Sequence, residues 1–203
     1  MAIPNSPNWS TLTNEKPYIT PSFPKPPLPS GVAAISLGGI ELNNSQGRLD
    51  TRYWLVVVDG VDVKIAGANG NGWGTPVTIF EEPDIIVEIS LTFDQTGRPL
   101  VFYKTSTDEL RIFWYDSVLE DYTIKLITSG NSPITCFDFP QDAGLSFTDI
   151  LLFYVRDNSL FMRVQRDRYN IEYDTGVNIE GIRIVSAGLR IDSRLQVVYE
   201  YIV

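Results

Sequence analysis

The stretch from residue 87 to residue 127 constrains the fold most, because it contains four short apolar runs separated by three polar turns. In the first run, Ile89, Leu91 and Phe93 alternate with polar residues, which is the period of a strand with one buried face. The second run, Leu100–Tyr103, is apolar throughout and is therefore expected to be buried on both faces. Four antiparallel strands within about 40 residues are typical of a propeller blade or of one sheet of a sandwich.

The same order of elements recurs along the chain. Each repeat contains a strand that ends at Asn or Asp, then a turn, and then a strongly apolar strand. The residues that end the first strands are Asn43, Asp94, Asp138 and Asp192. The strongly apolar strands that follow are Tyr53–Val58, Leu100–Tyr103, Ile150–Tyr154 and Leu195–Tyr199. Self-similarity at roughly 44 to 54 residues favours propeller blades, although any all-β protein has strands and turns at regular intervals.

These repeats predict an all-β fold without a helix longer than two turns, because no stretch has apolar residues at helical spacing over three turns. We expect about three and a half four-stranded antiparallel units, arranged as propeller-like blades or as sandwich-like sheets. The fourth unit, which runs to Val203, is expected to lack its third and fourth strands. The strongly apolar strands are expected to be central in their sheets, so their amides should be the most protected from hydrogen exchange.

Residues 1–32 differ in composition from the predicted repeat domain, residues 33–203. Most of the 13 prolines lie in this N-terminal part, which predicts an extended Pro-rich arm. The apolar side chains that could anchor the arm to a partner are Trp9, Tyr18, Phe23 and Leu28. The arm is either a disordered tail or a segment that binds its own domain or a neighbouring subunit, covering the edge of the last sheet.

Composition argues against several classes of function. A net charge of −9 disfavours specific nucleic-acid binding, and the chain has no histidine to act as a general base or a metal ligand. The single cysteine, Cys136, allows no internal disulfide and is expected to be a buried thiol. The sequence has no apolar run long enough to span a membrane. We therefore expect a protein that is not an enzyme, with no cofactor, no metal and no membrane span.

Two groups of polar residues are candidate functional sites. The carboxylates of Asp94, Asp138 and Asp192 could form the acid pair of a glycosidase, but their shared place in the repeat favours caps of turns. A basic cluster could contact a phosphate or a carboxylate of a partner, or could be the solvated face of a strand. Its arginines are Arg163, Arg166 and Arg168.

Two segments resemble repeats of virion structural proteins of tailed bacteriophages. They are F-D-Q-T-G-R-P-L-V-F-Y, followed by L-R-I-F-W-Y-D, and D-I-L-L-F-Y-V-R-D-N-S-L-F-M-R-V-Q-R-D-R-Y-N-I-E-Y. The resemblance covers Ile86 to Tyr173 and implies a tail-associated protein with propeller-like repeats but no shared catalytic residues. It also implies a virion location after assembly in the host cytoplasm. The implied partners are portal, tail or fibre subunits and further copies of the chain in a ring.

The sequence is also compatible with two other functions. One is a carbohydrate-binding or receptor-binding module of a tail fibre or spike, in which exposed Trp73, Trp114 and Tyr115 stack on a sugar. The other is a glycoside hydrolase built on a propeller, which needs two carboxylates about 5–10 Å apart in one pocket. The resemblance departs from a closed propeller in length, because three and a half repeats are short for one.

Overall fold

A computed structural model describes residues 32–38, 52–69, 72–94, 97–137, 149–180, 182–189 and 195–201. Within these ranges the chain forms 15 strands, and its only helical element is the single 3₁₀ turn η1, Gln165–Asp167. The expected all-β fold is therefore confirmed. Residues 1–31 of the predicted arm, with all four of its apolar anchors, lie outside the described residues, as do Asn43, Asp138 and Asp192.

The strands form four antiparallel sheets, which we call blades 1 to 4. Blade 1 consists of β1 (Ala33–Gly38), β2 (Arg52–Asp59), β3 (Asp62–Asn69), β4 (Gly72–Trp73) and β5 (Val77–Glu81). Blade 2 consists of β6 (Ile86–Phe93), β7 (Pro99–Thr105), β8 (Glu109–Asp116) and β9 (Asp121–Ser129). Blade 3 consists of β10 (Asn131–Phe137), β11 (Ile150–Arg156), β12 (Ser159–Val164) and β13 (Tyr173–Asn178). Blade 4 consists of β14 (Ile182–Leu189) and β15 (Leu195–Tyr201).

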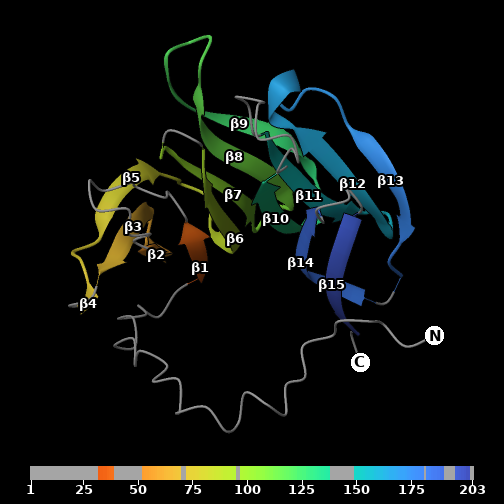
Figure 1. Cartoon of the computed structure of the whole chain (residues 1–203), viewed down its shortest axis with the longest axis horizontal. Helices are drawn as coiled ribbons and strands as arrows, with labels where there is room; N and C mark the ends of the chain where they lie inside the picture. Colours follow the sequence, from red (N-terminus) through yellow and green to blue (C-terminus); the bar gives the residue numbers. More distant parts are fainter. Residues whose placement is uncertain are drawn as a thin grey trace, which may run out of the picture.

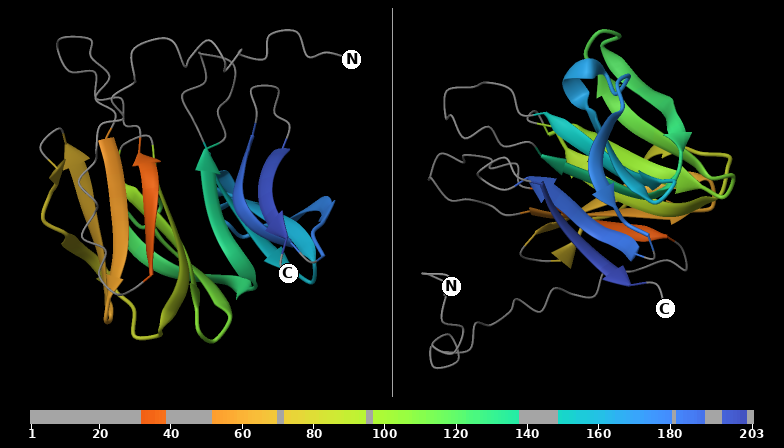
Figure 2. Two further views of the ribbon diagram at one scale, coloured as in Figure 1. Left: turned by 90° about the horizontal axis from the view of Figure 1, so that it is seen from below. Right: turned by 90° about the vertical axis from the view of Figure 1, so that its right-hand side faces the viewer.

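The blades follow one another in an arc, and the first strand of each packs beside the first strand of the next. Strand β1 lies beside β6, β6 beside β10, and β10 beside β14 (Figure 1). The later strands of each blade extend outward from this inner row (Figure 1), and Figure 2 shows the same sheets from two further sides. This arrangement gives the propeller-like order that the repeats predict, with three blades of at least four strands and a fourth of two described strands.

The second strand of blade 2 is buried on both faces, as its uniformly apolar sequence predicts. Leu100 and Phe102 of β7 point into a core shared with blade 3. Val101 and Tyr103 point the opposite way, into a core shared with blade 1. Because side chains alternate along a strand, one strand contributes to two separate cores.

Strand β11 repeats this arrangement one blade further along. Ile150, Leu152 and Tyr154 belong to the core between blades 2 and 3. Leu151 and Phe153 belong to the core between blades 3 and 4, together with residues such as Ile184 of β14. All five β11 side chains are buried, so this strand connects the second core to the third.

The described turns use the residues that turn chemistry demands. Gly60, at the tight β2–β3 hairpin, has a φ of +65°, which glycine adopts without a steric penalty. Asp94 begins the β6–β7 turn, and its Oδ1 accepts a hydrogen bond from the Arg98 N–H at 2.9 Å. Asp94 is therefore placed as the turn cap that its position in the repeat predicts.

The fourth strand of the third repeat starts later than the sequence indicates. The pattern at Tyr169, Ile171 and Tyr173 predicts a strand there, but β13 begins only at Tyr173. The preceding chain forms η1, and then Arg168 and Tyr169 adopt left-handed backbone conformations with φ of 52° and 59°. These turns bring the Tyr169 ring into the core beside Trp114, where it is fully buried. Burial of this ring explains why strand geometry is not maintained.

Hydrogen exchange should distinguish the second strands from one another. Strands β7 and β11 are paired on both sides, whereas β15 pairs only with β14 among the described strands. We therefore expect the amides of β7 and β11 to exchange slowest and those of β15 to exchange faster. The sequence alone predicts equally slow exchange for the second strands of all four repeats. Mass-spectrometric hydrogen exchange measures this. Exchange of β7 as fast as the turn after it would contradict the assignment.

Candidate functional site

Buried polar groups of the described chain gather where one blade packs on the next. Tyr103 and Tyr154 hold equivalent positions, each directly after a phenylalanine in the second strand of its blade. Both side chains are fully buried, and Tyr103 faces blade 1 whereas Tyr154 faces blade 2. A tyrosine hydroxyl in an apolar core needs a hydrogen-bond partner, so each position requires a polar neighbour.

Between blades 1 and 2, the partner is Glu82, in the link from β5 to β6. The Tyr103 hydroxyl donates to Glu82 Oε2 at 2.6 Å, and Arg111 Nη1 donates to Glu82 Oε1 at 2.7 Å. Arg111 also pairs with Asp84 at 2.7 Å and with Glu109. Burial, with the nearby Glu82 carboxylate, raises the pKa of Tyr103 well above its ordinary value. The buried Glu82 carboxylate thus obtains both a neutral and a charged donor.

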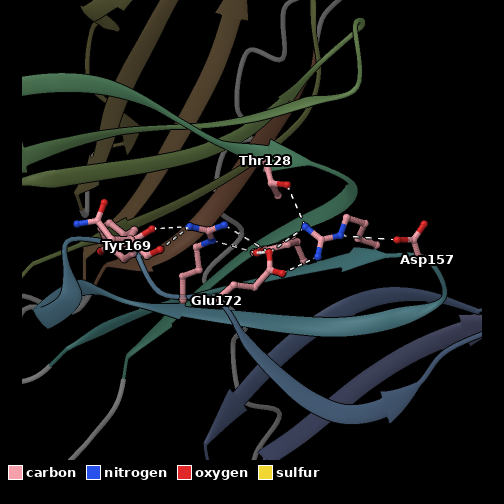
Figure 3. A network of polar contacts seen from close by, with 8 residues as sticks. Thr128, Asp157, Tyr169 and Glu172 are labelled. Carbon is pink, nitrogen blue, oxygen red and sulfur yellow. Dashed lines mark hydrogen bonds and ion pairs between the residues drawn. The ribbon is translucent and has the colours of Figure 1, made fainter.

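Between blades 2 and 3, the partner is Glu172, just before β13 (Figure 3). The Tyr154 hydroxyl donates to Glu172 Oε2, and Arg156 donates through Nη1 at 2.9 Å and Nη2 at 2.5 Å to the two carboxylate oxygens. Arg156 Nη1 also donates to Thr128 Oγ1 of β9 at 3.1 Å, which links the network to blade 2. The carboxylate therefore binds two side chains of β11, and Arg156 extends the network to β9.

The network displaces the pKa values of Glu172 and Tyr154 in opposite directions. Burial alone would raise the pKa of the Glu172 carboxyl, but the hydrogen bonds from Tyr154 and Arg156 hold it below its ordinary value. Burial, opposed by the hydrogen bond from Arg163 and assisted by the hydrogen bond to Glu172, raises the pKa of Tyr154 to about 12. At neutral pH the network therefore contains an ionised glutamate and a neutral tyrosine.

A third polar contact joins the same two blades at the end of β8. The buried Asp116 carboxylate pairs with Arg168 and accepts the Val118 N–H at 2.9 Å. Lys125 of β9 donates to the Arg168 carbonyl and to Asn170 Oδ1, both at 2.6 Å. Blade 2 therefore holds the segment between β12 and β13 by side chains from two strands.

The predicted basic cluster divides between interior and surface. Arg163 is mostly buried, and it donates to the Tyr154 hydroxyl at 3.0 Å and to the Tyr169 carbonyl at 2.8 Å. Arg168 pairs with Asp116, while Arg166 is exposed and pairs with Asp149. The solvated-face interpretation thus fits Arg166 best, and binding of a partner by these arginines stays a prediction.

The aromatic residues expected to stack on a sugar are not arranged as an exposed platform. Trp114 is only 4% exposed and packs edge-to-face on Tyr169, with ring centroids 5.2 Å apart, so its predicted exposure is wrong. The Arg98 guanidinium lies 3.5 Å from the centroid of the Tyr115 ring. Trp114 shares a face of β8 with Leu110 and Ile112, and this apolar alternation in the sequence already indicated burial.

Sequence reasoning missed Glu82 and Glu172. The available signal was a tyrosine inside an otherwise apolar strand, because such a hydroxyl needs a partner whose identity depends on the three-dimensional packing. Of the three candidate catalytic aspartates only Asp94 is described, and its carboxylate caps a turn.

Within the described ranges no cluster of His, Cys, Asp and Glu could hold a metal ion. No helix in that part of the chain is long and apolar enough to cross a membrane. No protein-family model matches the chain, and no curated protein matches it in sequence.

Replacing Glu172 by Gln should destabilise the protein in a pH-dependent way. The pKa of Glu172 is lower in the folded state than in the unfolded state, so its ionised carboxylate stabilises the folded protein. This stabilisation is fully present above the unfolded-state pKa of about 4.3, and it is lost as the pH falls through the folded-state pKa. We expect a loss of about 1.5–3 kcal/mol in the free energy of unfolding at pH 7, which shrinks below about pH 4. Urea unfolding across pH measures it. The exposed Glu180→Gln is the control, and an equal effect of both changes would contradict the network.

Replacing Tyr103 by Phe tests the interface between blades 1 and 2. The change keeps the ring but removes one donor from the buried Glu82 carboxylate, which should cost about 1–3 kcal/mol of unfolding free energy. Tyr173→Phe serves as a matched control, since that hydroxyl bonds Asp167 at the surface. Unfolding midpoints in urea should fall for Tyr103→Phe and stay within error for the control.

Proposed function

We propose that this chain is a structural component of the virion of a tailed bacteriophage, located at the tail or the head–tail junction. In this role it is not an enzyme, and it binds neighbouring subunits through its β-domain and its N-terminal arm. The resemblance of residues 86–173 to repeats of tail-associated virion proteins supports the proposal. The partners are portal, tail or fibre subunits and further copies of the chain in a ring.

The observation that carries the proposal is the edge of blade 4. Blade 4 has two described strands, whereas the other blades have at least four, and β15 pairs only with β14 among the described strands. A strand edge of this kind presents backbone donors and acceptors that can pair with a strand of another segment or subunit. Val198 of β15 is also 50% exposed, which provides apolar area for such a contact.

The ion pairs of the buried and partly buried carboxylates also suit a structural role. The carboxylates of Glu82, Asp116 and Glu172 each bond an arginine, and the residues involved come from different strands and links. Breaking one member of a buried pair is costly, because the other charge is left without compensation. Asp116 with Arg168 joins blades 2 and 3, and Glu82 with Arg111 holds the link between blades 1 and 2, so these pairs keep successive blades in fixed positions, as an assembly component requires.

Assembly can be tested with a matched pair of valines. Val198→Lys places a charge on the edge strand, and Val61→Lys places one in the β2–β3 turn at an equally exposed valine, also 50% exposed. We expect the wild-type chain to form a discrete oligomer, Val198→Lys to weaken it about tenfold or more, and Val61→Lys to leave it unchanged. Analytical ultracentrifugation measures the oligomer, and circular dichroism checks folding.

The virion location has its own test. Antibodies against the chain should label purified phage particles from the source of the sequence, at many copies per particle by quantitative mass spectrometry. A chain that stays monomeric at all concentrations and is absent from particles would overturn the proposal.

A further inference from the structure

The outermost strand of blade 2 carries an exposed apolar stripe formed by Tyr122, Ile124 and Leu126. These side chains are 37%, 42% and 55% exposed, and they lie on one face of β9 because they alternate along it. The outermost strand of blade 3 differs, because the exposed residues of β13 include Asp174, Gly176 and Asn178. An apolar outer face is therefore not a general requirement of a blade.

The stripe is the exposed end of an ordered aromatic stack. The Tyr122 ring stacks on Phe113 with centroids 4.9 Å apart, and Phe113 stacks on Phe80 of blade 1 at 4.5 Å. Tyr122 also meets Tyr115 edge-on at 5.4 Å. Side chains that are already ordered lose little entropy when a ligand binds them, so this surface is suited to binding.

One end of the stripe has an excess of negative charge. Leu126 lies opposite Arg111 on the neighbouring strand β8. The single Arg111 guanidinium is shared by the carboxylates of Glu82, Asp84 and Glu109, and the last two are partly exposed. An apolar, aromatic surface with an acidic end fits a ligand that is apolar, extended and carries a positive charge.

The Pro-rich segment Pro17–Pro29 of this same sequence has that chemistry. It contains Phe23 and Leu28, and its only charged residue is Lys25. Pro-rich segments bind aromatic-lined surfaces in an extended form that is already favoured before binding. At ~3.1 Å per residue the two apolar side chains would be roughly 15 Å apart, against roughly 14 Å from Tyr122 to Leu126 at ~3.4 Å per residue.

The position of Val32 favours binding of the Pro-rich segment from another copy over binding of the chain's own Pro-rich segment. The described chain begins at Val32, whose carbonyl accepts the Val58 N–H at the inner edge of blade 1, beside β6. Strand β9 is three strand spacings, about 14 Å, outward from β6. Four fully extended residues from Leu28 to Val32 span at most about 14 Å, and the direct path runs through the packed core. A neighbouring copy has no such restriction.

We propose that the stripe formed by Tyr122, Ile124 and Leu126 binds the Pro-rich segment Pro17–Pro29 of a neighbouring copy of this chain. This inference rests on the proposed function, in which the arm joins subunits, and it names the surface that the arm occupies. The acidic end of the stripe attracts Lys25 when Phe23 lies against Leu126, which sets the direction of the segment.

Photo-crosslinking of the full-length chain tests the contact without changing the stripe. Phe23 is replaced by the photoreactive residue p-benzoylphenylalanine, and this unlabelled protein is mixed with uniformly ¹⁵N-labelled wild-type chain before irradiation. We expect crosslinks to peptides that contain residues 121–129, in the ¹⁵N-labelled form. Crosslinks confined to the same copy would overturn the neighbouring-copy assignment, and crosslinks to other strands such as β15 would overturn the stripe.

A competition experiment provides the second measurement. A synthetic peptide of residues 17–29 should dissociate the oligomer of the full-length chain, whereas a peptide with both Phe23→Ala and Leu28→Ala should not. Ile124→Ser should weaken self-association about tenfold, and Ile171→Ser, at an isoleucine that is also exposed, should leave it unchanged. Equal effects of the two substitutions, in variants with unchanged circular dichroism, would contradict the proposal.

The outcomes separate this inference from the proposed function. A chain that is found in particles and self-associates, but whose crosslinks avoid β9, retains the structural role and loses the stripe as the binding surface. A chain that is monomeric and absent from particles loses both.

Discussion

The fold depends on strands that are buried on both faces. Strand β7 sends Leu100 and Phe102 into one core and Val101 and Tyr103 into another, and β11 does the same one blade further along. Blades 2 and 3 therefore each contribute one face to one core and the opposite face to the next core. Burial of apolar area stabilises by about 25 cal/mol per Å², so these double-faced strands contribute more to stability than any surface strand. The arc of blades follows from this shared burial.

The polar groups at the interfaces determine how the blades pack on one another as much as they stabilise the fold. Replacing a buried ion pair by apolar residues is often neutral or favourable, so the buried Glu82 carboxylate with Arg111 is not needed to supply burial energy, and Glu172 with Arg156 is only partly buried. Glu82 restricts how blade 2 lies on blade 1, because its N–H bonds Val61 of blade 1 while both donors to its carboxylate come from blade 2. Glu172 orders Arg156 within blade 3, and Arg156 in turn bonds Thr128 of blade 2. Hydrophobic contacts bring the blades together, and the carboxylates select the geometry.

Local sequence patterns were sufficient to predict the strands and several turns. Alternation identified β6, a continuous apolar run identified β7, and the position of Asp94 in its repeat indicated a turn cap. The patterns failed where a distant contact decides the conformation. Tyr169 leaves strand geometry to reach Trp114 in another blade, and neither Glu82 nor Glu172 is marked by its neighbours in sequence. Such partners are fixed only when the blades pack.

The buried tyrosines have one more consequence, which concerns strand register. A slip of one residue along a strand moves every side chain to the opposite face, and a polar face normally penalises that error. In β7 and β11 both faces are apolar, so a slipped strand would still bury hydrocarbon on each side. The hydroxyls of Tyr103 and Tyr154 supply the missing penalty, because only the native alignment brings them to Glu82 and Glu172. The tyrosine hydroxyl of each strand thus favours the native register over a slipped one.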